Sequence, residues 1–254
     1  MKYESRDIVY MHIQSSERFV ITSGMSFREF AFSLEKPLNH VLLLKHDYDD
    51  TEFNLNVSLD YVANENVAKL VKADVRSFGD FCWVDFKEES NLDDLDGMEL
   101  AELLYLGHMK HHLKQPFFSK LQNQFVYLAQ DDEWFSKVYY RSMGTYYKML
   151  GNLLSIKFEE VKMDRAWFGL RKKRGLPPVP ADVLSDLSTM LSEGLVFSFK
   201  NAVQTRTKIE IPMWVVGDFT NMDEMLDSYY DVRTQKPDAY VTFLWKLGVW
   251  SIVR

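Results

Sequence analysis

Residues 203–215, VQTRTKIEIPMWV, alternate between two kinds of side chain and decide the class of the fold. The odd positions carry Val, Thr, Thr, Ile, Ile, Met and Val, and the even positions carry Gln, Arg, Lys, Glu, Pro and Trp. This period of two predicts a strand with one buried and one solvent-facing side, and we expect Trp214 on the exposed side. Because Pro212 has no N–H for a ladder, we expect that end of the strand at an edge or a bulge.

The same reasoning predicts strands near both ends of the chain and helices between them. Further strands are expected at 41–45, 51–61, 81–86, 125–128, 240–245 and 249–253. Helices are expected at 26–34, 66–72, 98–112, 181–191 and 222–230, and along an amphipathic stretch at 132–161. Gly144 and Gly151 share one face of that stretch, where they allow either close helix packing or a break.

These elements predict an α+β protein with two β-rich ends and a helical middle. We expect a β-rich subdomain at 1–96, the helical middle at 97–193, and a second β-rich subdomain at 194–254 that packs into the same globule. The order strand, strand, helix, strand recurs in 40–87 and 195–246. Asp74-Val-Arg-Ser and Asp231-Val-Arg-Thr follow the two predicted helices. This recurrence indicates either an internal ββαβ duplication or chance, since ββαβ is a common order.

Composition and glycine spacing exclude several classes of protein. The chain has 254 residues and a net charge of −7, with 46% hydrophobic residues, so it is neither disordered nor suited to nucleic acid as its main partner. No two of its 11 glycines are closer than six residues apart. That spacing excludes a Rossmann fingerprint, a P-loop and a nucleophile elbow, and we predict no cofactor.

Cysteine count and hydropathy point to a cytoplasmic protein. Cys82 is the only cysteine, so the chain has no internal disulfide and no cysteine-based zinc site. The first ten residues lack an apolar signal core, and no apolar run approaches the ~20 residues of a membrane helix. We therefore expect no membrane contact, and the sequence leaves the oligomeric state open.

Two small polar clusters are candidates for chemistry. His108, His111 and His112 share a helix face at metal-ligand spacing, but neighbouring lysines are also typical of a solvated helix end, and we predict that no metal binds there. His46, Asp47 and Asp50 follow a predicted strand, where acid–base groups are common. A polar turn between two strands explains the same three residues.

Two charge blocks are candidates for binding. Residues 85–102 carry eight acidic side chains and one lysine, and residues 162–175 carry six basic side chains and one aspartate. Each is also consistent with a solvated loop or helix end. The basic block includes two aromatic residues and suits an anionic partner. The predicted contact residues are Arg165, Trp167, Phe168, Arg171, Lys172, Lys173 and Arg174.

The last third of the chain resembles an uncharacterised family of soluble proteins from bacillus-like Gram-positive bacteria. The resemblance lies in Pro177-Pro-Val-Pro, Glu193-Gly-Leu-Val-Phe-Ser-Phe, Glu210-Ile-Pro-Met-Trp and Gly217-Asp-Phe-Thr-Asn-Met-Asp-Glu-Met. It implies a cytoplasmic bacterial protein of unknown role and brings no site residues.

The missing motifs and the opposed charge blocks favour a non-enzymatic binding or regulatory protein that contacts a protein partner through charged and aromatic patches. Two alternatives stay open. One is an enzyme with an unrecognised acid–base or histidine-based metal site, and the other is a small-molecule binder with a pocket between subdomains.

Overall fold

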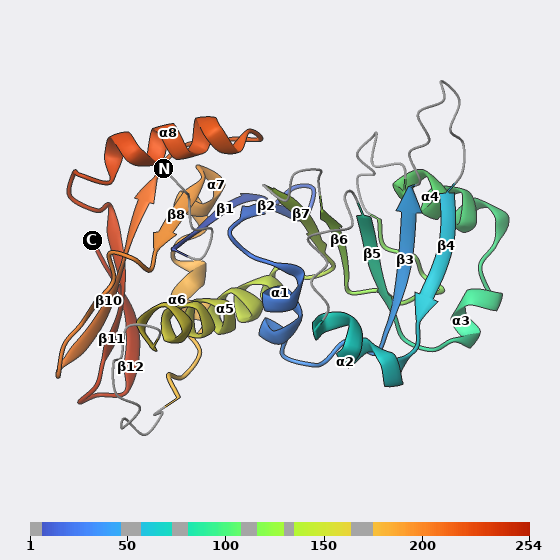
Figure 1. Ribbon diagram of the computed structural model, residues 1–254, viewed down its shortest axis with the longest axis horizontal. Helices are drawn as coiled ribbons and strands as arrows, with labels where there is room; N and C mark the ends of the chain where they lie inside the picture. The colour runs from blue at the N-terminus through green and yellow to red at the C-terminus, as the bar shows by residue number, and fades with distance from the viewer. Residues whose placement is uncertain (1–6, 47–56, 73–80, 108–115, 130–134, 164–174) are drawn as a thin grey trace.

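One antiparallel sheet forms the middle layer of the protein (Figure 1). The computed structural model describes residues 7–46, 57–72, 81–107, 116–129, 135–163 and 175–254. Within these residues the sheet has twelve strands. They are β1 (Ile8–Gln14), β2 (Phe19–Ser23), β3 (His40–His46), β4 (Val57–Val62), β5 (Phe81–Phe86), β6 (Phe125–Ala129), β7 (Ser136–Tyr140), β8 (Leu195–Ser198), β9 (Val203–Gln204), β10 (Lys208–Val215), β11 (Ala239–Leu244) and β12 (Val249–Val253).

The spatial order of the strands shows how the chain crosses the molecule. The order is β12-β11-β10-β8-β1-β2-β7-β6-β5-β3-β4, and β9 pairs with β10. The chain starts in one half with β1 and β2, builds β3 to β7 in the other half, and returns for β8 to β12. The β2–β7 ladder, from Phe19↔Tyr139 to Thr22↔Ser136, therefore joins the two halves.

Helices cover both faces of the sheet. They are α1 (Phe27–Ser33), α2 (Asn64–Lys72), α3 (Ser90–Asp93), α4 (Gly97–Gly107), α5 (Met143–Met163), α6 (Ala181–Ser185), α7 (Ser188–Ser192) and α8 (Met222–Val232). On one face α1, α2, α5, α6 and α7 close a single large core. On the other face α4 covers a cluster over β3, β5, β6 and β7, and α8 covers a cluster over β1, β8 and β10.

The prediction of helices combined with strands is confirmed, but strands dominate and the middle of the chain is not purely helical. β6 and β7 lie within the predicted helical segment and occupy the centre of the sheet. The amphipathic stretch from 132 was wrong at its start, because β7 precedes α5. Residues 137–140 of β7 are buried on both sides, and a strand buried on both faces has no simple alternation to read.

The ββαβ duplication, one of the two alternatives for the recurrent order, is not confirmed, because the two segments pair their strands differently. In the first segment β3 is central and pairs with both β4 and β5. In the second segment β10 is central and pairs with both β8 and β11. The difference arises because β8 is held against β1 in the interior of the sheet, which leaves β10 to take the outer strands.

Pro212 lies inside the sheet without breaking a ladder. On one side of β10, residues 209–210 pair with β9 and residues 213–215 pair with β8. Pro212 falls in the gap between these two ladders, where no N–H is required. We expected an edge or a bulge at Pro212. Instead, the pairing of β10 with β9 ends before this residue and its pairing with β8 begins after it.

Local capping explains where α1 and α8 begin. Ser26 Oγ accepts the Glu29 N–H (3.2 Å), and Glu29 Oε2 accepts the Ser26 N–H (2.8 Å), which completes a capping box for α1. Asn221 Oδ1 accepts the N–H groups of Asp223 and Glu224 at the start of α8. Both signals are local in sequence, so both helix starts were predictable.

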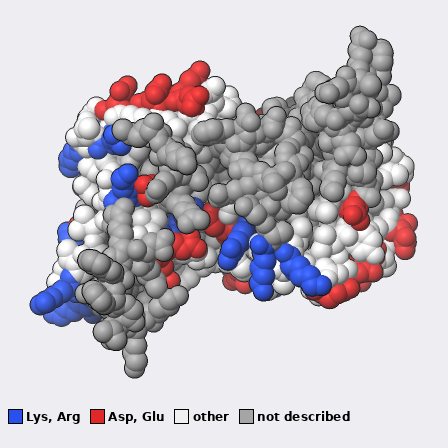
Figure 2. Space-filling model, viewed as in Figure 1, with Lys and Arg blue, Asp and Glu red and all other residues white. Residues whose placement is uncertain are grey.

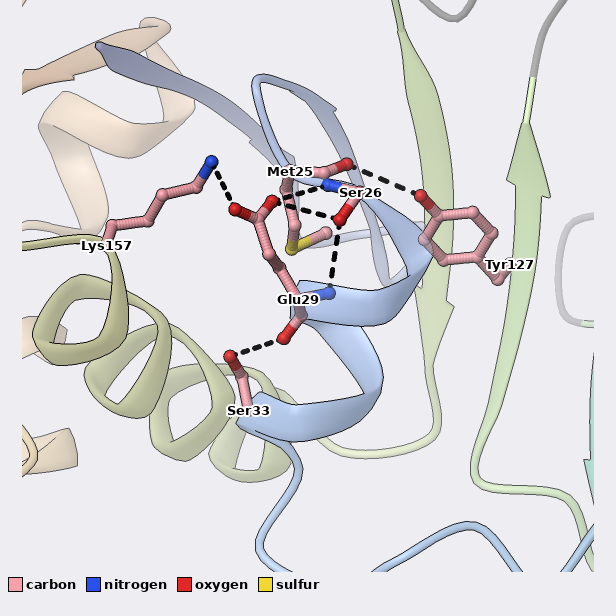
Figure 3. A network of polar contacts seen from close by, with 6 residues as sticks. All are labelled: Met25, Ser26, Glu29, Ser33, Tyr127 and Lys157. Carbon is pink, nitrogen blue, oxygen red and sulfur yellow. Dashed lines mark hydrogen bonds and ion pairs between the residues drawn. The ribbon is translucent and has the colours of Figure 1, made fainter. Parts of the chain in front are cut away.

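The polar network of α1 continues into α5 (Figure 3). Glu29 Oε1 lies 2.6 Å from Lys157 Nζ, and the Lys157 side chain is only 2% exposed. Asn152 of α5 donates to the Ser33 carbonyl at 2.8 Å, and Lys148 lies 2.9 Å from Glu35 Oε2. These contacts fasten the two helices that carry the chain between the halves of the sheet.

Gly151 allows α5 to approach the segment before α6. Val179 N–H donates to the Gly151 carbonyl at 3.2 Å, and a Cβ at Gly151 would lie 2.0 Å from the Val179 carbonyl oxygen. Of the two alternatives for this glycine, close packing is correct. At Gly144 a Cβ would meet only Ser142 Oγ, at 3.4 Å.

The two glycines of α5 should respond oppositely to alanine. Gly151→Ala should lower the free energy of unfolding by about 2 kcal/mol, because the backbone of Val179 must move. Gly144→Ala should leave it unchanged or raise it by about 0.5 kcal/mol, because a helical glycine is replaced without a clash. Urea denaturation of both variants measures the difference, and equal effects would contradict this account of Gly151.

Replacing Lys157 alone should lower the free energy of unfolding more than replacing both Lys157 and Glu29. Lys157→Met should destabilise the protein by about 3 kcal/mol, because the Glu29 carboxylate loses its counter-charge in a poorly solvated place. Adding Glu29→Gln should recover part of that loss, although each change removes a polar contact. Chemical denaturation of both variants tests this, and a double variant less stable than Lys157→Met would contradict it.

Candidate interaction surface

Most of the residues singled out from the sequence lie outside the described part of the chain. This holds for Asp47 and Asp50, for His108, His111 and His112, and for the basic segment from Arg165 to Arg174. His46 is the last residue of β3. Among the described residues, no three His, Cys, Asp or Glu side chains are grouped to hold a metal ion.

Two further expectations were tested directly. Trp214 is buried rather than exposed: α8 covers it, its ring lies edge-on to Tyr229, and its indole N–H donates to the Gln235 carbonyl. The solvent-facing side assigned from alternation is therefore an interior side under a helix. In the ranges the structure describes, no helix combines the length and apolar character needed to cross a membrane.

α4 is fixed to the sheet by its first turn and its inner face. Asp96 Oδ1 accepts the N–H groups of Met98 (2.9 Å) and Glu99 (2.8 Å), so one acidic residue of the predicted block serves as a helix cap. Leu103 and Leu106 are fully buried in the cluster against the strands. Glu99 is held by Ser119, whose hydroxyl donates to Glu99 Oε1 at 3.1 Å.

The outer face of α4 is apolar and exposed. Met98 is 74% exposed, Tyr105 is 42% exposed and Leu100 is 40% exposed. Met98, Ala101 and Tyr105 follow each other at i, i+3 and i+7 on one side of the helix, and Leu100 lies on its other flank. Large apolar side chains exposed together on one short helix are a feature of contact surfaces, so the outer side of α4 has that character.

Exposed acidic side chains precede α4 in the sequence, and one lies on the helix itself. The exposed acids around α3 and α4 are Glu88, Glu89, Asp93, Asp94, Asp96 and Glu102. Figure 2 shows acidic side chains around α3 at the right of the molecule. We call the outer residues of α4 together with these acids the α4 surface. Its charge would attract Lys- or Arg-rich surfaces.

A second group of acids lies on α8, at the top left of Figure 2. Asp223, Glu224, Asp227 and Asp231 all point to solvent, and the inner face of the helix packs on Trp214. Like charges at i, i+4 destabilise an isolated helix slightly, so this face is not arranged for helix stability. Unlike the outer face of α4, it carries no large exposed apolar side chain.

A polar cluster holds the loop before α8 to β1. The Tyr10 hydroxyl donates to the Gly217 carbonyl and accepts the Phe219 N–H, both at 3.0 Å, and burial raises the pKa of Tyr10 to about 12. Asp218, between these two residues, places Oδ1 2.8 Å from Nδ1 of the buried His12. Gly194 permits this loop to approach, because a Cβ there would lie 1.8 Å from the Gly217 carbonyl oxygen.

Lys137 lies on the same face of the sheet as His12. Ile21 of β2 pairs with His12 on one side and with Lys137 on the other, so the three residues form a row across three strands. The Lys137 ammonium lies 3.7 Å from the centre of the Phe19 ring and 4.9 Å from that of Tyr139. Burial lowers the pKa of Lys137 to about 8. Sequence reasoning missed this lysine because it assigned its strand to a helix.

Asp85, the first acid of the predicted block, organises the start of β6. Its Oδ1 accepts the N–H groups of Gln124 and Phe125, both at 2.9 Å. Burial raises the pKa of Asp85 to about 7, and the hydrogen bonds from these two amides oppose the rise. This residue therefore serves the fold rather than the surface.

Comparisons with known proteins return no relative for this arrangement. No family model, no curated protein and no solved structure matches the chain.

Asp85 should make the stability depend on pH. Its pKa in the folded protein, about 7, exceeds the ordinary value of 3.8, so the folded state binds this proton more tightly than the unfolded chain. The contribution of Asp85 to the free energy of unfolding should therefore fall as pH rises from about 4 to 7. Relative to wild type, Asp85→Asn should gain on the order of 1–2 kcal/mol between pH 4.5 and 8. Urea denaturation at both pH values measures this, and a pH-independent difference would contradict it.

Proposed function

We propose that this chain is a non-enzymatic binding protein of the cytoplasm and that the α4 surface contacts its partner. The exposed apolar side of α4 is the observation that carries the proposal, with Met98 74% exposed in the first turn of the helix. The partner is a protein segment that presents apolar side chains among Lys and Arg residues.

Burial of the α4 surface supplies the affinity in this proposal. Covering a large apolar side chain that was exposed contributes about 1.5–3 kcal/mol, so Met98 and Tyr105 suffice as anchors of a modest interface. Neither residue is needed for the core, which α4 supplies through Leu103 and Leu106. Affinity and stability are thus carried by different sides of one helix.

The acids of the α4 surface supply orientation and association rate. Asp93, Asp94 and Glu102 are exposed and flank the apolar side chains. Opposite charge on a partner raises the association rate at low ionic strength, and salt screens this effect over about 10 Å at 0.1 M. The complex should therefore weaken as salt is added.

A second candidate function is an enzyme or small-molecule binder that uses the row His12, Ile21 and Lys137. Two ionisable side chains on one sheet face, with one pKa displaced by burial, are a typical setting for acid–base chemistry. The contacts of Lys137 with Phe19 and Tyr139 also explain its position structurally. We therefore place the α4 surface first.

The proposal is tested by photo-crosslinking from the α4 surface. A benzophenone amino acid at Met98 should capture a partner in cells, whereas the same probe at Val203, which is 51% exposed on β9, should not. The double variant Met98→Gln, Tyr105→Gln should bind the captured partner at least about tenfold more weakly, since two anchors lose apolar area. Calorimetry with the purified pair measures the affinity.

Stability serves as the control for the same variants. The double variant should unfold within about 0.5 kcal/mol of wild type, because surface positions contribute little. Val203→Gln should change neither stability nor affinity. Equal capture at both probe positions, or a captured partner without a basic segment, would contradict the proposal.

A further inference from the structure

The sheet ends in two strands with different outer edges. β4 and β12 lie at the two ends of the strand order, and in the part of the chain that the structure describes no strand pairs with their outer sides. Each edge therefore presents backbone N–H and C=O groups that another strand can bind.

The edge at β4 is protected, whereas the edge at β12 is not. β4 contains the exposed Asp60, whose Oδ1 accepts the N–H of Tyr61 at 2.8 Å, so a charge and an occupied donor discourage pairing. β12 reads Val-Trp-Ser-Ile-Val and has no charged residue and no proline. Natural edge strands usually carry such protection, so its absence points to a partner strand.

The two sides of β12 differ in burial. Trp250 is buried in the main core beside Phe243, and Ile252 packs on the same core. Val249 is 47% exposed and Val253 is 44% exposed, on the opposite side of the strand. A strand added at this edge would cover apolar side chains on both faces of the sheet.

The sequence of β12 is self-complementary. When two copies of β12 run antiparallel about Ser251, Ser251 meets Ser251, Trp250 meets Ile252, and Val249 meets Val253. Every contact is then apolar or, at the centre, between small hydroxyl groups, and aromatic with β-branched pairs are favourable across strands. A two-fold axis requires this kind of match, because the same patch must serve both copies.

We propose that the occupant of the β12 edge is a second copy of this chain, paired antiparallel about Ser251. The pairing extends the sheet across the two-fold axis and brings Trp250 and Ile252 of each copy together beside the main core. No charge lies within the five paired residues, so the contact tolerates salt, in contrast to the α4 surface.

Charge substitutions at the paired valines test both the dimer and its register. In sedimentation equilibrium the wild-type chain should dimerise. The variant Val249→Lys, Val253→Lys places like charges opposite each other twice and should weaken the dimer at least about tenfold. The variant Val249→Lys, Val253→Glu places opposite charges together twice and should restore most of the affinity. Asp60→Lys, on the other edge, should have no effect.

Each alternative outcome overturns the proposal. A wild-type chain that stays monomeric at high micromolar concentration excludes the second copy as occupant, even if a foreign strand binds there. A dimer that persists in the double-lysine variant lies elsewhere, and a dimer that the Lys–Glu variant fails to restore has another register. Circular dichroism of each variant separates lost pairing from lost folding, since both valines are exposed.

Discussion

The ladder between β2 and β7 is the junction on which the rest of the structure depends. Its four residue pairs are the only sheet contact in the described chain between the half that contains β1 and β8 to β12 and the half that contains β3 to β7. The chain crosses this junction twice, after β2 through α1 and after β7 through α5. These two helices lie side by side on one face of the sheet, and Glu29 and Lys157 hold them together (Figure 3).

Polar side chains lie on both faces of the sheet at the β2–β7 ladder, and they fix how the elements beside the ladder pack. On the side covered by α1 and α5, both oxygens of Glu29 are used, by Lys157 and by the capping box, so the pair specifies how α1 meets α5. On the other side, Lys137 lies over Phe19 and spans the ladder. A buried ion pair contributes little net stability compared with apolar residues, and its attested use is to fix register and orientation. We interpret Glu29–Lys157 in that way.

Features encoded by a few neighbouring residues were predictable, and features set by distant partners were not. The capping box at Ser26, the cap at Asn221 and the alternation in β10 are local signals, and each produced the expected element. Trp214 was misplaced because alternation cannot tell solvent from a covering helix. Lys137 and the β7 strand were misassigned because burial on both faces removes the period of two. Only part of the α4 surface was predictable. Its acids form a block in the sequence, but the exposure of Met98 depends on which side of α4 packs against the sheet.

The two proposed contacts lie at opposite ends of the strand order, which gives them a physical relationship. α4 packs against β3, β4 and β5, whereas β12 is the last strand at the other end. A partner on α4 and a second copy on β12 therefore do not compete for the same surface. A pair joined through β12 would carry two α4 surfaces on one continuous sheet, and a partner with two basic segments of suitable spacing would bind both. Such binding gains affinity from effective concentration without any new contact, provided that the linker spans the distance. Pairing through β12 would then strengthen partner binding at α4, because two weak contacts made by one partner bind more tightly than a single one.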